Sequence, residues 1–245
     1  MLRTPPWLRD VARLPRALLP DGRCRLCALA SRAPLCSACQ CAMRRAPAWS
    51  CERCAVELPA PAVCCGACAL RPPAFARTVA WGDYAAQLDR LVARIKHGED
   101  PVLARWLGRL LARSLRARWP SRQLAAAHVL PMPMTPAALR RRGYNQAWEL
   151  ALGLARELGW SADCRQLLRR REGPAQSSLP LARRGANVRG AFEVRALPRG
   201  TRVLLVDDVM TSGASAEHAA RALLRAGAAE VAVAVLLRTP PPPWV

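Results

Sequence analysis

The chain has 245 residues, of which 52% are apolar, and this composition excludes an intrinsically disordered protein. No apolar run approaches the roughly 18 residues of a membrane span, and Arg, Asp and Pro interrupt the apolar residues of the basic N-terminal segment 1–20. We therefore expect a cytoplasmic protein with no membrane span and no signal peptide. The net charge of +21 favours a polyanionic partner, although 37 of the 38 cations are Arg, a bias typical of GC-rich genomes.

Ten of the eleven Cys residues fall between residues 24 and 68, which indicates a separate Cys-rich module over 21–71. The module contains four C-x2-C pairs, and each pair can offer two thiolates to one metal ion. In chain order the pairs are Cys24 and Cys27, Cys36 and Cys39, Cys51 and Cys54, and Cys65 and Cys68. Sequential pairing predicts two structural zinc ions in a double zinc ribbon, but the spacing also permits a cross-braced arrangement, pairs one with three and two with four. A disulfide framework is disfavoured because we expect no export, and Cys41, Cys64 and Cys164 stay unassigned.

After a linker at Pro72 and Pro73, strands and helices alternate and predict a second domain over 72–239. We expect strands at 77–84, 128–133 and 164–170, helices at 85–98, 102–119 and 145–159, and a loop with a short helix at 177–192. A strand–helix–strand unit then occupies 202–208, 215–227 and 229–238, before a Pro-rich tail at 240–245. Apolar strands that alternate with helices predict an α/β fold with a parallel sheet and helices on both of its faces.

Asp207 and Asp208 follow the apolar strand segment 203–206, which places both carboxylates at a carboxyl end, where parallel sheets bind ligands. The next loop contains small and hydroxyl residues and leads into a helix, whose N-terminus favours a phosphate. Carboxylates repel phosphate but accept hydrogen bonds from hydroxyls, so the pattern predicts a ribose diol beside a 5′-phosphate, as in phosphoribosyl pyrophosphate (PRPP). An Asp pair of the response-regulator or phosphatase type is the alternative, but no further acidic strand end, late Lys or D-x-D motif accompanies this pair.

The stretch VLLVDDVMTSGAS, residues 203–215, resembles the PRPP-binding motif of type I phosphoribosyltransferases. The resemblance implies that Asp207 and Asp208 contact the ribose hydroxyls. It also implies that the 5′-phosphate is held by the loop residues Thr211, Ser212, Gly213, Ala214 and Ser215.

Three further stretches narrow the resemblance to the ComF/GntX family. PMPMTPAALRRRGYNQA at 131–147 is similar to its Pro-x-Pro…Arg-Arg-Gly-Phe-Asn-Gln segment, with Tyr144 in place of the usual Phe. IKHGED at 95–100 resembles its Lys-Tyr-x-Gly-Asp segment, with His97 where an aromatic residue is common. QSSLPLARRGANVRGAF at 176–192 resembles its Gln…Arg-x-x-Asn-x-x-x-Ala-Phe segment. With the Cys-rich module in front, the resemblance extends from Cys24 to Arg238.

Cations and a hydroxyl from other segments suit a pyrophosphate group. Thr135 and then Arg140, Arg141 and Arg142 follow a predicted strand end, and guanidinium groups match phosphate oxygens. A solvated helix face or a nucleic-acid contact is the alternative for the three Arg residues. Lys96 is the only lysine of the chain, which indicates a place for a compact ammonium group, and a chance survivor on a solvated helix is the alternative.

The family resemblance implies a protein that binds PRPP with Mg²⁺ and acts in competence, on incoming single-stranded DNA and with partners such as a helicase. Mg²⁺ would stabilise charge on the pyrophosphate, and no side chain stands out as a nucleophile, so catalytic residues stay unassigned. Two alternatives remain at this point. One is a nucleobase phosphoribosyltransferase of a salvage pathway, and the other is a non-catalytic adaptor that senses PRPP.

Overall fold

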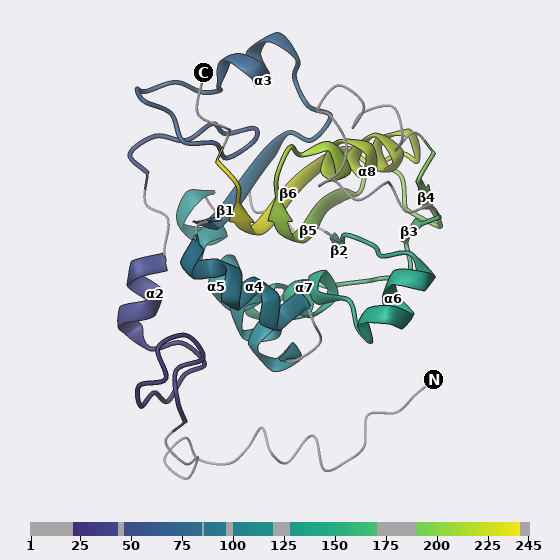
Figure 1. Cartoon of the computed structure of the whole chain (residues 1–245). Helices are drawn as coiled ribbons and strands as arrows, with labels where there is room; N and C mark the ends of the chain where they lie inside the picture. Colours follow the sequence, from purple (N-terminus) through teal and green to yellow (C-terminus); the bar gives the residue numbers. More distant parts are fainter. Residues whose placement is uncertain are drawn as a thin grey trace. The chain divides into compact units, whose positions relative to one another are not determined.

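The computed structural model describes residues 22–43, 47–84, 86–96, 100–119, 128–170 and 190–240 (Figure 1). The chain divides into two compact units, Met1–Met43 and Arg44–Val245. The boundary falls inside the segment 21–71, after the second of the four C-x2-C pairs, so each unit holds two pairs. No helix within the described ranges is long and apolar enough to cross a membrane.

The described residues of the first unit, 22–43, form short loops and one helix, α2 (Ser37–Met43). A β-bridge between Arg23 and Ala30 closes the loop that carries the first Cys pair. Among the described residues of this unit, the buried apolar side chains are those of Cys24, Leu35 and Met43. Because so small a core contributes little free energy of folding, a cross-link such as a metal ion would stabilise this part of the chain strongly.

The second unit is built around a four-stranded parallel sheet with the strand order β1-β6-β5-β2. The strands are β1 (Arg77–Asp83), β2 (His128–Pro131), β5 (Arg202–Met210) and β6 (Glu230–Arg238). The two central strands, β5 and β6, are buried over most of their length because they consist mainly of Val, Leu and Ala. The parallel sheet expected from the sequence is confirmed.

Helices cover both faces of this sheet, also as expected (Figure 1). The helices on one face are α4 (Ala86–Lys96), α5 (Pro101–Arg118) and α7 (Gln146–Leu158), and α8 (Ala214–Arg225) covers the other face. The remaining helices are short: α3 (Gly66–Leu70) and α6 (Pro136–Arg142).

A small antiparallel pair of strands, β3 (Leu167–Arg169) and β4 (Phe192–Val194), packs near α8. The sequence predicts β3 but not β4, since it favours a loop with a short helix at 177–192. Phe192 instead begins a strand that pairs with Arg169. The rest of that predicted loop, up to residue 189, lies outside the described residues, as does the tail 241–245.

The strands of the main sheet have unequal lengths, and this difference opens the sheet at one place. β2 pairs with β5 only as far as Pro131, opposite Val206, whereas β5 continues to Met210 along β6. Asp207 and Asp208 therefore lie within β5, beyond the end of β2, rather than after the strand as the sequence predicts. Their environment is still that of a strand end, because β2 no longer covers one edge.

Two glycines allow α5 and α7 to pack at very short distance. A Cβ atom on Gly108 would lie 2.1 Å from the main-chain oxygen of Leu150. A Cβ atom on Gly153 would lie 1.8 Å from the main-chain oxygen of Arg105. Since both clashes are with backbone, no side-chain rearrangement can relieve them, and the two helices would have to move apart.

We predict that Gly153→Ala lowers the free energy of unfolding by about 1–3 kcal/mol, because the added methyl group forces the helices apart. Thermal unfolding followed by circular dichroism would show this as a fall in Tm of roughly 2–4 °C per kcal/mol. Gly66→Ala is the matched control, because nothing lies within 4 Å of a Cβ atom at that helical position. Equal Tm values for the two variants would contradict this account of the helix contact.

Candidate functional site

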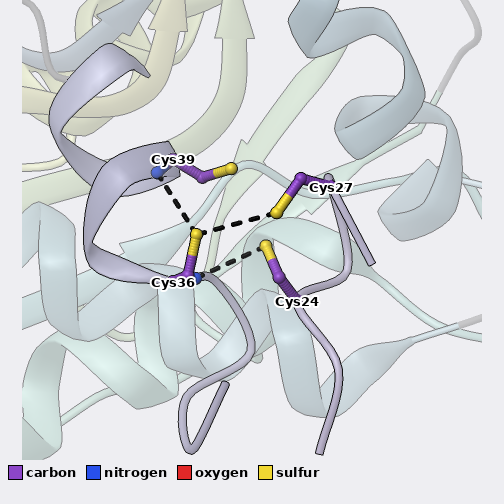
Figure 2. Close-up of side chains that lie close together, drawn as sticks. All are labelled: Cys24, Cys27, Cys36 and Cys39. Atoms are coloured by element: carbon purple, nitrogen blue, oxygen red, sulfur yellow. Dashed lines mark hydrogen bonds between the residues drawn. The ribbon is translucent and has the colours of Figure 1, made fainter. Parts of the chain in front are cut away.

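The eight paired cysteines form two separate clusters, and both follow the sequential pairing. The first contains Cys24, Cys27, Cys36 and Cys39 (Figure 2), and the second contains Cys51, Cys54, Cys65 and Cys68. Within each cluster the four sulfurs lie within 4.8 Å of one another. The cross-braced alternative is thereby removed, and no cysteine forms a disulfide.

The sulfur positions suit a tetrahedral zinc ion. A Zn–S distance of about 2.3 Å places neighbouring sulfurs about 3.8 Å apart. The Sγ atoms of Cys27 and Cys36 are 3.7 Å apart, and those of Cys54 and Cys65 are also 3.7 Å apart. Each cluster can therefore hold one zinc ion.

The two clusters share a backbone geometry at their first C-x2-C turn. In both, the main-chain N–H groups of the second and third cysteines donate to the first sulfur: those of Cys27 and Cys36 to Cys24, and those of Cys54 and Cys65 to Cys51. The residue after each turn is an alanine with positive φ, 60° at Ala28 and 58° at Ala55. An L-residue keeps this conformation only where its surroundings hold it there.

The thiols within each cluster differ in their pKa values. Burial opposes ionisation of Cys24, but hydrogen bonds from main-chain N–H groups outweigh it and lower the pKa of Cys24 to about 6. Burial and then the neighbouring sulfurs raise the pKa of Cys39 to about 12. In the second cluster the pKa of Cys51 is lowered in the same way, and burial raises that of Cys54 to about 11. A divalent cation would remove the repulsion that keeps the other thiols protonated.

We predict about two zinc ions per chain by elemental analysis of the purified protein, one for each cluster. Cys36→Ser should reduce the content to about one, because a cluster with three thiolates holds zinc far more weakly. Cys41→Ser is the matched control: Cys41 is exposed and belongs to neither cluster. Loss of zinc from Cys41→Ser, or two ions in Cys36→Ser, would contradict the assignment.

A pocket of about 490 Å³ lies at the carboxyl ends of β2 and β5 in the second unit. Its polar lining contains both carboxylates of the strand end, four cationic side chains, two hydroxyls and two amides. These residues are Asp207, Asp208, Lys96, Arg141, Arg142, Arg169, Thr135, Ser215, Asn145 and Gln146. A smaller pocket of about 140 Å³ shares Lys96, both aspartates and Ser215, and adds Thr211, Gly213 and Ala214 from the next loop.

The two carboxylates have different environments. Asp208 is 5% exposed, and its Oδ2 lies 3.7 Å from Lys96 Nζ and 3.4 Å from Gln146 Nε2. Asp207 is half-buried, and its Oδ1 accepts a hydrogen bond of 2.9 Å from the main-chain N–H of Asp208. Burial and then the charge of Asp208 raise the pKa of Asp207, and the charge of Lys96 partly offsets this rise. The only lysine of the chain thus pairs with Asp208 and offsets part of the negative charge of the acidic pair, a role that the sequence did not suggest.

Three consecutive side chains at the start of α7 position the groups around Asp208. The Tyr144 hydroxyl donates to the main-chain oxygen of Ile95, beside Lys96, and burial raises the pKa of Tyr144 to about 12, so the phenol remains a donor. Asn145 caps α7 and donates from Nδ2 to the Met132 oxygen at 3.1 Å. Gln146 is 6% exposed, and its Oε1 is buried with no hydrogen-bond partner. The sequence motif contains these residues, but only the structure shows their positioning role.

The loop between β5 and α8 has the geometry of an anion site. Gly213 stands at the N-cap of α8 with φ 79°, a conformation that favours glycine, and no side chain caps the helix. The first turn of α8 therefore directs N–H groups toward the loop hydroxyls, where an anion is favoured. Ser212 Oγ lies 3.4 Å from the main-chain nitrogen of Ala214.

The three consecutive Arg residues of α6 differ in whether they line the pocket. Arg141 and Arg142 line the larger pocket, whereas Arg140 is exposed and is not among its lining residues. Thr135 is buried and caps α6 by accepting from the Ala138 N–H at 3.2 Å. Arg169 of β3 also lines the pocket. The sequence did not indicate this residue, because nothing distinguishes it from the other Arg residues among the 37 of the chain.

Comparison with known proteins first defines the class. Residues 147–242 match the family described as the phosphoribosyl transferase domain, a stretch that includes Asp207, Asp208 and the loop after them. Together with the parallel sheet, this match gives the second unit the fold of type I phosphoribosyltransferases.

Full-length relatives then define the family. The DNA utilization protein YhgH of Salmonella typhimurium is 33% identical over 238 residues, which cover 96% of this chain and 99% of that protein. Competence protein F of Haemophilus influenzae is 31% identical over 208 residues, 83% of this chain and 90% of that protein. The chain belongs to the ComF/GntX family.

Among solved structures, an allosteric regulatory enzyme of purine biosynthesis is 25% identical, over 54% of this chain and 25% of that enzyme's chain, with a TM-score of 0.36.

Proposed function

We propose that this chain binds PRPP together with Mg²⁺ in the pocket at Asp207 and Asp208, and that it acts in the uptake and use of DNA. The observation that carries the proposal is the set of charged and polar groups that line two pockets with shared residues. The carboxylate pair lines both pockets, the hydroxyl-rich loop at a helix N-terminus lines the smaller one, and most of the cationic side chains line the larger one. We further propose that one zinc ion occupies each four-cysteine cluster.

The 5′-phosphate, the ribose and the pyrophosphate of PRPP correspond to these three groups of lining residues. The loop 211–215 suits the 5′-phosphate, because its N–H and hydroxyl groups are donors at the positive end of α8. Asp207 and Asp208 suit the ribose diol as hydrogen-bond acceptors. Lys96, Arg141 and Arg142 suit the pyrophosphate, and Mg²⁺ would share its negative charge.

The relatives give the cellular context of the proposal. One is named a DNA utilization protein and another a competence protein, and both cover most of this chain. The net charge of +21 agrees with single-stranded DNA as a partner. A PRPP site in such a protein can serve either a transfer reaction or the sensing of PRPP.

Calorimetry with PRPP, with and without Mg²⁺, tests the site. We expect Asp207→Asn with Asp208→Asn to weaken binding by roughly 100-fold or more, because two charged hydrogen bonds of about 1.5–3 kcal/mol each are lost. Asp163→Asn is the control, since Asp163 pairs with Arg165 outside the pocket. No binding by the wild type, or unchanged binding by the double variant, would refute the site.

Base-dependent release of pyrophosphate would then distinguish a transferase from an adaptor.

The proposed DNA contact has its own test in the salt dependence of oligonucleotide binding. If several Arg side chains contact phosphates, the affinity for a single-stranded oligonucleotide should fall roughly a thousandfold between about 50 and 200 mM salt, as counterions are released. Fluorescence anisotropy at a series of salt concentrations measures this slope. An affinity that is almost independent of salt would argue against phosphate contacts.

A further inference from the structure

We infer that the second four-cysteine cluster, acting through the side chain of Arg238, holds the loop 211–215 in the shape that receives a phosphate. Arg238 is thereby a positioning residue for the anion site, and the metal of this cluster serves ligand binding as well as folding. The inference rests on the proposed PRPP function for the identity of the ligand. The positioning itself rests on contacts within the second unit.

Arg238 is the last residue of β6, and its guanidinium joins the loop to the Cys cluster. Nη1 donates to the main-chain oxygens of Met210 (3.1 Å) and Thr211 (2.5 Å), and also to that of Thr239. Nε donates to the main-chain oxygen of Cys54 at 2.8 Å. The residue is only 6% exposed, so the guanidinium is held by backbone carbonyl dipoles. The guanidinium donates from two nitrogens in one rigid plane to the carbonyls of the loop and of Cys54. A lysine has a single side-chain nitrogen and could not replace it.

The turn of the second cluster is fixed against the sheet by three consecutive carbonyls. Those of Glu52 and Arg53 accept from the N–H (2.9 Å) and the hydroxyl (2.5 Å) of Thr78 in β1, and that of Cys54 accepts from Arg238. Ala55 follows with φ 58° and is packed in the same apolar cluster as Phe75 and Met210. The orientation of the Cys54 carbonyl depends on this unusual conformation, which metal binding by Cys51 and Cys54 would maintain.

The segment after the cluster supports the loop from a second direction. The Ala74 N–H donates to Glu217 Oε2 of α8 at 2.6 Å. Phe75 is buried, and its Cζ would lie 3.8 Å from a Cβ atom on Gly213. The loop 211–215, proposed to receive the ligand, is therefore also supported by the segment that follows the second Cys cluster. None of these contacts involves a residue of the first cluster, which belongs to the other compact unit.

Hydrogen–deuterium exchange of the full-length chain tests the positioning without any ligand. We expect the amides of residues 211–215 to exchange faster in Arg238→Met, which keeps an unbranched apolar stem but removes all donors, and in Cys54→Ser. Cys27→Ser in the first cluster is the matched control and should leave exchange in this loop unchanged. Unchanged exchange in both Arg238→Met and Cys54→Ser would overturn the inference, as would an equal acceleration in Cys27→Ser.

Calorimetry with two ligand fragments connects the positioning to binding. Ribose 5-phosphate should bind about tenfold more weakly to Arg238→Met than to wild type, whereas inorganic pyrophosphate, which the cationic wall receives, should bind with nearly unchanged affinity. Parallel loss of both fragments would indicate a general loss of fold and overturn the positioning role. A wild-type chain that binds neither PRPP nor ribose 5-phosphate would refute the proposed function instead, and the exchange result would still decide the role of Arg238.

Discussion

Two adjacent carboxylates within an apolar strand, beyond the end of its neighbour β2, impose the constraint on which the pocket depends, because their charges repel each other and Asp208 is buried. Side chains from separate helices offset this repulsion. α4 provides the ammonium group of Lys96 and α7 provides the amide of Gln146. Tyr144 fastens the end of α4, and the glycine contact between α5 and α7 sets how closely that helical layer packs. The acidic pair is thus tolerated because several distant segments are held in register around it.

The two four-cysteine clusters show how one local motif can serve two structural purposes. In both, the main-chain N–H groups of the second and third cysteines donate to the first sulfur, and an alanine with positive φ follows the first turn. The first stands in a unit whose described residues bury very few apolar side chains, so a metal ion held there would be their main source of stability. The second places Ala55 in the core shared with the sheet, and its main chain accepts hydrogen bonds from β1 and β6. A metal ion held by the second cluster would therefore act on the core of the larger unit.

The sequence predicted the elements with strong periodicity and the residues with distinctive chemistry. The central strands are continuous apolar runs, and the Cys pairs and the Asp pair stand out from an Arg-rich background, so these features could be read directly. β4 was missed because three residues beside a polar segment carry no period. Arg169, Arg238 and the link from Lys96 to Asp208 were missed because they depend on which strands are neighbours, and one Arg resembles another in the sequence.

The ion pair at Asp208 has a practical consequence for chemistry on this protein. Lys96 carries the only side-chain amine of the chain, and its side chain is 35% exposed at the edge of the pocket. Amine-selective acylation of an internal residue is therefore confined to a single atom, Nζ of Lys96. A reporter group attached there would lie beside the acidic pair without any engineered cysteine, which matters in a chain whose eleven thiols make maleimide labelling unselective. The amino-acid bias of the chain thus makes its own pocket chemically addressable.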